Sequence, residues 1–159
     1  MAGFRFSGDV LATLTFEELA SASEVPLGRT DWIAVDQQSI SAFARVTRDE
    51  QWIHTDPVAA SAGPFGNTIA HGYLTLSLVS HVLQQLLVVV DCSMAINYGL
   101  DRVRFPSVVP AGSLIRASAV LTRAAPVQGG FQTWVTVTME CDRSERPVLV
   151  ADVLSRFLA

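Results

Sequence analysis

Two runs of alternating apolar and polar residues decide the fold, and both lie in residues 115–140, IRASAVLTRAAPVQGGFQTWVTVTME. The first run covers residues 115–121 and the second covers residues 131–139, and in each every second side chain fits one buried face. Since the side chains of a β-strand alternate between its two faces, each run predicts a half-buried strand. The glycine pair at residues 129–130 predicts a turn between two antiparallel strands, and residues 148–158 predict a third strand.

Ahead of these strands, residues 71–87 (HGYLTLSLVSHVLQQLL) are apolar nearly all round, with small residues interspersed. Such a composition is typical of a helix in a protein core. A long buried helix followed by long antiparallel strands predicts a single α+β domain in which a curved sheet wraps the helix. Capping residues and helical spacing predict three shorter helices, at residues 15–23, 36–47 and 56–63.

The length of 159 residues fits one domain, which we divide into a flank that packs on the domain (1–30) and the domain itself (31–159). Only 16% of the residues are charged, against about 25% in an average protein, and this favours a homodimer or a higher oligomer. The net charge of −4 supplies no basic footprint, so we expect no nucleic-acid partner. No signal peptide or membrane-spanning run is visible, which favours a soluble, cytoplasmic protein with no membrane contact.

The chain contains no lysine, and all eleven basic residues are arginines. Without lysine, Schiff-base chemistry, the P-loop lysine and a lysine general base are excluded. The two cysteines, Cys92 and Cys141, form no CxxC pair, and we interpret them as small buried hydrophobic residues in a reducing compartment.

Asp49 and His54 are the candidates for acid–base chemistry. An extended or turning segment of this spacing can bring a carboxylate and an imidazole to opposite sides of one bound water. The spacing also fits a structural interpretation, in which Asp49 caps a turn and His54 bonds the backbone. Gly72, at the start of the long helix, has an N–H that a carbonyl oxygen can approach closely, or it simply permits tight packing.

Several short motifs follow one another in order: Phe43, residues 48–54 (RDEQWIH), Ala60, and residues 56–57, 63–66 (GPFG), 69–72 (IAHG) and 97–106 (NYGLDRVRFP). They resemble the MaoC-like hydratases, a hot-dog-fold family that includes the R-specific enoyl-CoA hydratases. The nodulation-protein-N-like branch is the most similar. The resemblance covers roughly residues 30 to 158, and it is specific because separate motifs occur in the order that the family has.

The resemblance implies a hot-dog domain that adds water to a trans-2-enoyl thioester, or removes it from an R-3-hydroxyacyl thioester, as a hydro-lyase of fatty acid metabolism. It implies Asp49 and His54 as the acid–base pair that holds the water. It also implies the Gly72 N–H as the donor to the thioester oxygen and Ser80 as a hydroxyl that orients the pair. A serine inside a helix otherwise bonds the carbonyl four residues back.

The substrate is expected to be an acyl thioester of CoA or of an acyl-carrier protein, and residues near the motifs are candidates to bind it. Asn67 and His71 are candidates close to the pair, although a loop role explains Asn67 equally well. Arg102 and Arg104 are candidates for the CoA phosphates, because arginine suits bidentate contact, or they lie on a solvated strand face. We expect no cofactor, since CoA is part of the substrate, and no metal.

The sequence departs from the family at Arg48, where a glycine is usual. A bulky cation there would narrow the entrance or lower the pKa of the neighbouring acid, which affects rate and substrate range more than reaction type. Two alternatives remain open. One is a hot-dog acyl-CoA thioesterase, against which the retained Asp49 and His54 argue. The other is a non-catalytic acyl-thioester-binding subunit of a heteromeric dehydratase, which Arg48 favours.

Overall fold

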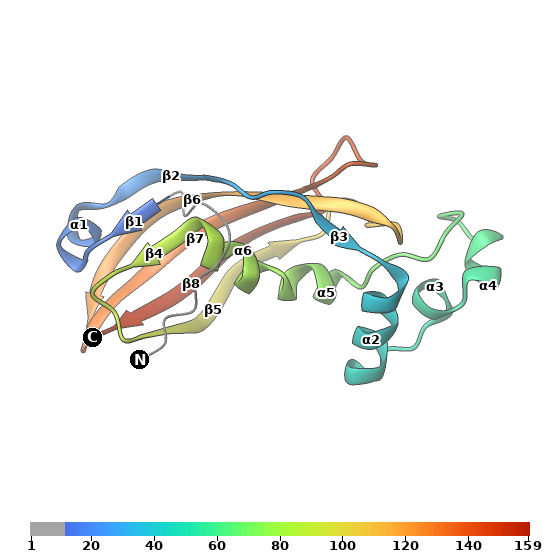
Figure 1. Cartoon of the computed structure of the whole chain (residues 1–159), viewed down its shortest axis with the longest axis horizontal. Coiled ribbons are helices and arrows are strands. Elements are labelled where there is room, and N and C mark those ends of the chain that lie inside the picture. Colours follow the sequence, from blue (N-terminus) through green and yellow to red (C-terminus); the bar gives the residue numbers. More distant parts are fainter. Residues whose placement is uncertain (1–11) are drawn as a thin grey trace.

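A curved antiparallel sheet wraps one helical layer in the computed structural model, which describes residues 12–159 (Figure 1). The part of the expected flank at residues 1–11 lies outside the described residues. The strand order is β2-β6-β7-β8-β5, and β3 also pairs with β6. The strands of this sheet are β2 (Ser23–Arg29), β3 (Ile33–Val35), β5 (Met94–Arg104), β6 (Ser113–Val127), β7 (Gly130–Cys141) and β8 (Leu149–Leu158).

The helices occupy two places. The described helices are α1 (Phe16–Ser21), α2 (Gln37–Thr47), α3 (Trp52–Thr55), α4 (Pro57–Ser61), α5 (Gly72–Ser77) and α6 (Val79–Leu86). Helices α5 and α6 run along the inside of the sheet, whereas α2, α3 and α4 lie beyond its end (Figure 1). Two further strands, β1 (Ala12–Leu14) and β4 (Leu87–Val89), form a small parallel pair.

The three predicted strands are confirmed as β6, β7 and β8, which pair antiparallel in that order. The alternation places one face of each strand in the core. In the register of β6 and β7, Ala119 lies opposite Val137 and Leu121 lies opposite Val135, and all four side chains are buried. Full burial of a valine or leucine side chain contributes roughly 1.5–3 kcal/mol, so these positions fix which face of the sheet meets the helices.

The three predicted short helices are confirmed, and their caps explain where they begin. Thr15 forms a capping box with Glu18 ahead of α1. The Asp36 carboxylate accepts from the Ser39 N–H at 2.8 Å at the start of α2. The Asp56 carboxylate accepts from two N–H groups at the start of α4, where Pro57 supplies the first helical residue.

The helix predicted over residues 71–87 differs from the expectation in two ways. It is divided at Leu78 into α5 and α6. The hydroxyl of the neighbouring Ser77 donates to the Tyr73 carbonyl at 2.7 Å. A bond of this kind, from a serine to the carbonyl four residues back, often bends a helix. The helix is also not buried on all sides in this chain. Its exposed residues recur at helical spacing, and they are Tyr73, Ser77, His81 and Gln84. The helix is therefore exposed along one stripe and buried or half-buried elsewhere.

Five of the described strands were not expected from the sequence, namely the short strands β1, β3 and β4 and the longer strands β2 and β5. β2 falls in the region interpreted as a flank, yet it hydrogen-bonds to β6, so residues 23–29 form an edge of the main sheet. β5 forms the opposite edge, and its register against β8 shifts twice. Every residue of β5 except Val103 is exposed, so the strand has no alternating buried face that could have predicted it.

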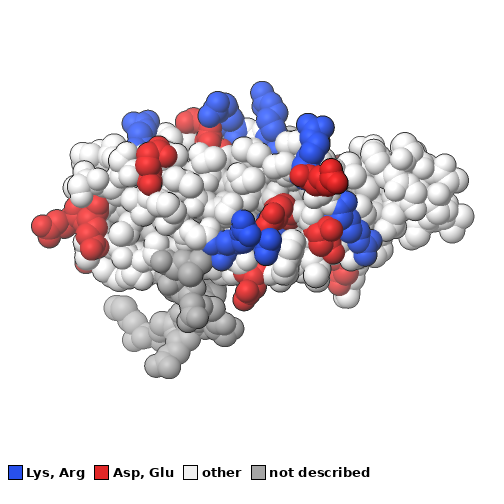
Figure 2. All heavy atoms as spheres, turned by 90° about the horizontal axis from the view of Figure 1, so that it is seen from above, with Lys and Arg blue, Asp and Glu red and all other residues white. Residues whose placement is uncertain are grey.

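Charged side chains of both signs are interspersed on the face of the molecule seen from above the sheet (Figure 2). That face therefore carries no continuous basic region. The end that holds α3 and α4 is nearly free of charge in this view, since no Asp, Glu, Lys or Arg occurs in residues 57–90. Within residues 12–159, no helix has the length and hydropathy that crossing a bilayer requires.

Gly130, at the tight start of β7, provides a test of this sheet. A Cβ added there would lie 1.9 Å from the Phe157 carbonyl oxygen, so Gly130→Ala forces β7 and β8 apart. We expect the free energy of unfolding to fall by about 1–3 kcal/mol, measured by urea denaturation. Gly99→Ala is the matched control, because a Cβ there meets no atom within 4 Å. Equal unfolding midpoints for the two variants would contradict this description of the β7–β8 pairing.

Candidate active site

The extended segment at residues 68–70 joins the end helices to the sheet. The Ile69 N–H donates to the Ile53 carbonyl at 2.9 Å, which holds α3 against the segment. On the other side, the Ala70 N–H donates to the Val109 carbonyl at 2.8 Å, and the Ala111 N–H donates to the Thr68 carbonyl at 2.8 Å. Because helix α5 begins directly after it, the segment fixes α3 relative to the first turn of α5.

His54, on α3, is buried and points to this segment. Its Nδ1 lies 2.7 Å from the Ile69 carbonyl oxygen. A carbonyl only accepts, so Nδ1 carries the proton and the lone pair of the neutral ring is on Nε2. Burial lowers the pKa of His54, against the opposing effect of the Ile69 bond. The site therefore favours a neutral imidazole whose free nitrogen can accept a proton.

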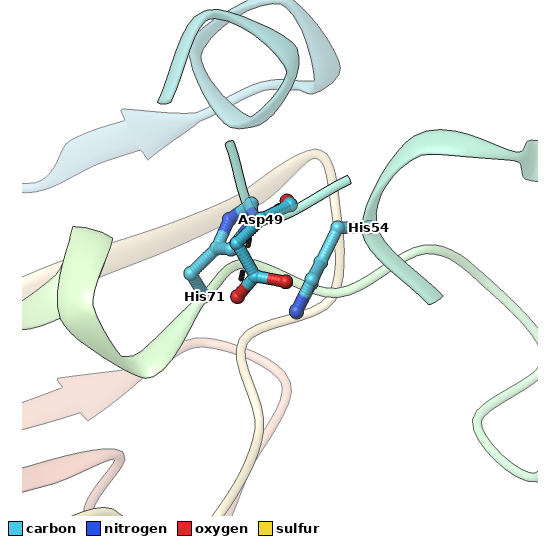
Figure 3. A group of neighbouring side chains, drawn as sticks. All are labelled: Asp49, His54 and His71. Atoms are coloured by element: carbon cyan, nitrogen blue, oxygen red, sulfur yellow. Dashed lines mark hydrogen bonds and ion pairs between the residues drawn. The ribbon is translucent and has the colours of Figure 1, made fainter. Parts of the chain in front are cut away.

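Asp49 lies beside His54, and His71 contacts both residues. The His71 Nε2 lies 2.9 Å from the Asp49 carbonyl oxygen and 4.0 Å from its carboxylate Oδ2. The rings of His54 and His71 are stacked, with centroids 3.7 Å apart and planes 24° from parallel. Figure 3 shows the Asp49 carboxylate directed toward the His54 ring. One polar atom from each of the three side chains lies within 4.8 Å of the others.

Gly72, the first residue of α5, lies in a pocket of about 200 Å³ together with His54. As the first residue of a helix, its N–H has no partner within the helix. A Cβ on residue 72 would lie 3.1 Å from the Phe105 ring, so any larger residue would push the ring aside by a few tenths of an ångström. The pocket thus brings a base and a backbone donor to one space. Its other lining residues are mostly apolar: Ile69, Ala70, Thr75, Phe105, Ser107, Val108, Val109 and Val148.

Asp49, His54 and His71 also form the one group of possible metal ligands found among the described residues. Their arrangement fits a hydrogen-bonded cluster better than a metal site. In stacked rings the lone pairs lie in two nearly parallel planes, and such planes do not converge on one point. In addition, His71 Nε2 and His54 Nδ1 are engaged with carbonyl oxygens. The geometry therefore supports acid–base chemistry by Asp49 and His54.

Four of the predicted site residues lie apart from this pair, and Ser80 and Asn67 are two of them. Ser80 is on α6, where its hydroxyl accepts from the Asn97 amide at 3.0 Å and lines a different pocket, between α6 and the sheet. It does not follow the alternative of bonding the carbonyl four residues back, and its role in orienting the pair stays a prediction. Asn67 bonds the Ala111 carbonyl and the Thr68 N–H, which is the loop role.

Arg102 and Arg104 lie at the end of β5 in a third hollow, which Thr136, Val150 and Asp152 also line. Arg102 is 2.7 Å from the Asp152 carboxylate, and this contact lowers the pKa of Asp152. Arg104 bonds the Val103 carbonyl and directly precedes Phe105, which lines the His54 pocket. The two arginines are therefore next to the pocket along the chain, and binding of phosphate by them stays a prediction.

Two residues that support the site were not found from the sequence. Gln37 donates to the His54 carbonyl at 2.8 Å and accepts from the Thr68 hydroxyl. It therefore joins α2 to α3 and to the extended segment at residues 68–70. No local pattern predicts such a long-range contact. Thr75 lies one turn after Gly72 on the same helix face and lines the pocket. Residues three apart share a helix face, so the spacing between Gly72 and Thr75 could have identified Thr75 from the sequence.

The chain matches known proteins over most of its length. The family model described as MaoC like domain matches residues 18–143. The 3-hydroxyacyl-thioester dehydratase Z of Mycobacterium tuberculosis H37Rv is 43% identical over 149 residues, which cover 91% of this chain and 99% of that protein. Nodulation protein N of Rhizobium leguminosarum bv. viciae is 42% identical, with 87% of this chain and 88% of that protein covered.

Solved structures agree on the fold. The unliganded R-hydratase PhaJ1 from Pseudomonas aeruginosa superposes with a TM-score of 0.73 at 18% identity, over 90% of this chain and 84% of that one. At this identity the likeness concerns the fold alone. It confirms the predicted α+β hot-dog architecture.

The lowered pKa of His54 predicts how stability depends on pH. Between the ordinary pKa near 6.5 and the lower folded value, the unfolded state binds a proton that the folded state excludes. The free energy of unfolding therefore falls as the pH drops from about 7.5 through this window. We expect His54→Gln to flatten that dependence in urea titrations at several pH values.

The exposed His81 supplies the control, since His81→Gln should keep the wild-type pH dependence. The carboxyls of Asp36 and Asp152 do not interfere. Their pKa values are lowered from 3.8, by the Ser39 N–H and by Arg102 respectively, so they titrate at more acidic pH. A slope in His54→Gln as steep as that of the wild type would contradict a buried, neutral His54.

Proposed function

The chain belongs to the MaoC-like domain family, and on this premise we propose that it is an R-specific enoyl-CoA hydratase or 3-hydroxyacyl-thioester dehydratase. The two activities are directions of one reaction. The observation that carries the proposal is the pocket that His54 and Gly72 share, with the Asp49 carboxylate beside it. A hydration needs a base for water, a proton for the substrate and a donor for the carbonyl oxygen, and these groups supply all three.

In the hydration direction, the thioester oxygen accepts from the Gly72 N–H, which polarises the carbonyl and makes C3 electrophilic. Water lies between the Asp49 carboxylate and His54 Nε2. As the water oxygen bonds to C3, its proton passes to Nε2, and the negative charge moves to the enolate oxygen beside Gly72. The proton is then delivered to C2 and the neutral base is restored. Attack and protonation from one face give syn addition and the R-3-hydroxyacyl product.

The reaction adds the elements of water and changes no net oxidation state, so it needs no redox cofactor. The acyl group would arrive as a thioester of CoA or of an acyl-carrier protein. Arg102 and Arg104 are the proposed contacts for a carrier phosphate, because they end the strand that leads into Phe105 and the pocket. Arg104 has the side chain better suited to this role, since Asp152 already neutralises Arg102.

Replacing either member of the pair tests the reaction directly. We expect Asp49→Asn and His54→Gln each to lower kcat by about 10²–10⁴-fold, because each removes a proton-transfer group with little change in size. The measurement is the loss of enoyl absorbance with crotonyl-CoA and a longer 2-enoyl-CoA, together with chiral analysis of the product.

The other outcomes separate the alternatives. Release of free CoA thiol without hydration would indicate a thioesterase. No turnover at any chain length, with acyl-CoA binding retained in Asp49→Asn, would indicate a binding subunit of a heteromeric dehydratase. An S product would contradict the proposed geometry of addition.

We further propose that the protein is a homodimer that pairs along β5. This strand ends the sheet with 11 residues, and its large apolar side chains are exposed: Met94, Ile96, Tyr98 and Leu100. An edge strand of this length and hydrophobicity favours pairing with another chain. If a second copy pairs antiparallel along β5, the backbone N–H and C=O groups of this edge find hydrogen-bond partners on both subunits.

A charge on the edge strand tests the dimer. We expect Leu100→Glu to convert the dimer to a monomer, since it brings two carboxylates close together at the paired edges. Mass is measured by light scattering after size-exclusion chromatography over a range of protein concentrations. Val46→Glu is the matched control, because Val46 is 84% exposed on α2, away from β5. Both variants remaining dimeric would refute pairing along β5.

A further inference from the structure

His71 is a buried imidazole that contacts both members of the proposed pair, yet the reaction as described does not use it. Its side chain is 2% exposed. It stands immediately before α5 and does not line the pocket that Gly72 and His54 share. A substrate in that pocket therefore meets His54, with the His71 ring stacked against it (Figure 3).

The contacts of the His71 ring define its state. Nε2 faces the Asp49 carbonyl at 2.9 Å, and since a carbonyl only accepts, Nε2 carries a proton. Nδ1 is buried and has no hydrogen-bond partner among residues 12–159. One hydrogen bond therefore fixes the ring, together with two aromatic neighbours: His54 at 3.7 Å and Phe43 at 5.1 Å between centroids.

These contacts join the loop after α2 and helix α3 to the start of α5, in addition to the bond between the Ile69 N–H and the Ile53 carbonyl. Asp49 follows Arg48, whose φ of +62° ends α2 in a left-handed conformation, and the Asp49 carboxylate is 41% exposed. The His71 N–H holds the Asp49 backbone from the start of α5. The same ring supports one face of the His54 imidazole, which is otherwise fixed by the Ile69 carbonyl.

We propose that His71 is a positioning residue, which holds the Asp49 backbone through Nε2–H and the His54 ring by stacking, so that both groups face one water. The inference rests on the proposed function, because the water and its acid–base pair are those of the hydratase. It gives His71 a role different from the direct substrate contact that the sequence suggested.

Two substitutions separate the hydrogen bond from the stacking. His71→Phe keeps a flat ring against His54 and removes the donor, whereas His71→Gln keeps an N–H donor and removes the ring. We expect kcat to fall on the order of 10²-fold in His71→Phe, because misplacement of about 1 Å has an effect of that size. His71→Gln should fall less, and KM should change little in both. Thermal unfolding of each variant identifies any loss that comes from the fold.

A second readout does not depend on turnover. The chain has three histidines, so imidazole ¹⁵N spectra report His54, His71 and His81 separately. The titratable groups close to His54 are Asp49 and His71, and burial is the largest effect that lowers the pKa of His54. The His71 ring covers one face of His54, so His71→Gln, which removes the ring, should raise the pKa of His54, whereas His71→Phe, which keeps a ring there, should change it less. His81→Gln, on the exposed stripe of the helix, is the matched control and should leave kcat and the His54 titration unchanged.

Full kcat in both variants, or a change in KM alone, would overturn the proposal, and the second result would restore the substrate-binding role. An unchanged titration of His54 in both variants would overturn it as well. If the wild-type protein shows no hydration, the proposed function fails, and the ¹⁵N titration still decides whether His71 controls His54. If one variant does not fold, the other decides both readouts.

Discussion

The two polar backbone groups of Ile69 are the constraint on which the site depends. The N–H binds the Ile53 carbonyl, and the carbonyl accepts from the His54 ring, so one residue anchors both the backbone and the side chain of α3. Both bonds are formed in a buried place, where leaving either group unpaired would destabilise the fold by roughly 1–3 kcal/mol. The bond to the ring also determines which nitrogen of His54 is free. The hydrogen bond that holds the His54 ring in place therefore also determines that Nε2 is the nitrogen that can accept a proton.

The elements predicted from the sequence are those whose signals are local. The alternation in β6 and β7 and the caps at Asp36 and Asp56 operate within a few residues, so they could be identified from the chain alone. The edge strand β5 could not, because it has no buried face in the single chain and its register shifts. The long helix was expected to be buried all round because its composition is mostly apolar, whereas the spacing of Tyr73, Ser77, His81 and Gln84 places them on one exposed stripe.

The same distinction applies to the candidate site. Asp49, His54 and Gly72 were assigned from the motifs of the family that the sequence resembles, and the structure brings Asp49 to His54 and His54 to Gly72. The spacing of Asp49 and His54 left a structural interpretation open, and part of it holds, since His54 does bond the backbone. The bond goes to a carbonyl 15 residues away, which no local pattern specifies. For the same reason Gln37, which reaches across from α2, was missed.

The apolar walls of the pocket serve the chemistry as well as the packing. Burial lowers the pKa of His54 and so favours the neutral imidazole that can accept a proton, and the burial comes from neighbours such as Phe105 and Val109. A weakly polar pocket also strengthens any hydrogen bond that the Gly72 N–H donates, because water competes less for the acceptor. Phe105 approaches residue 72 so closely that only glycine fits without displacing the ring. Because residue 72 is glycine, the apolar Phe105 ring can lie directly beside the backbone N–H that donates to the substrate.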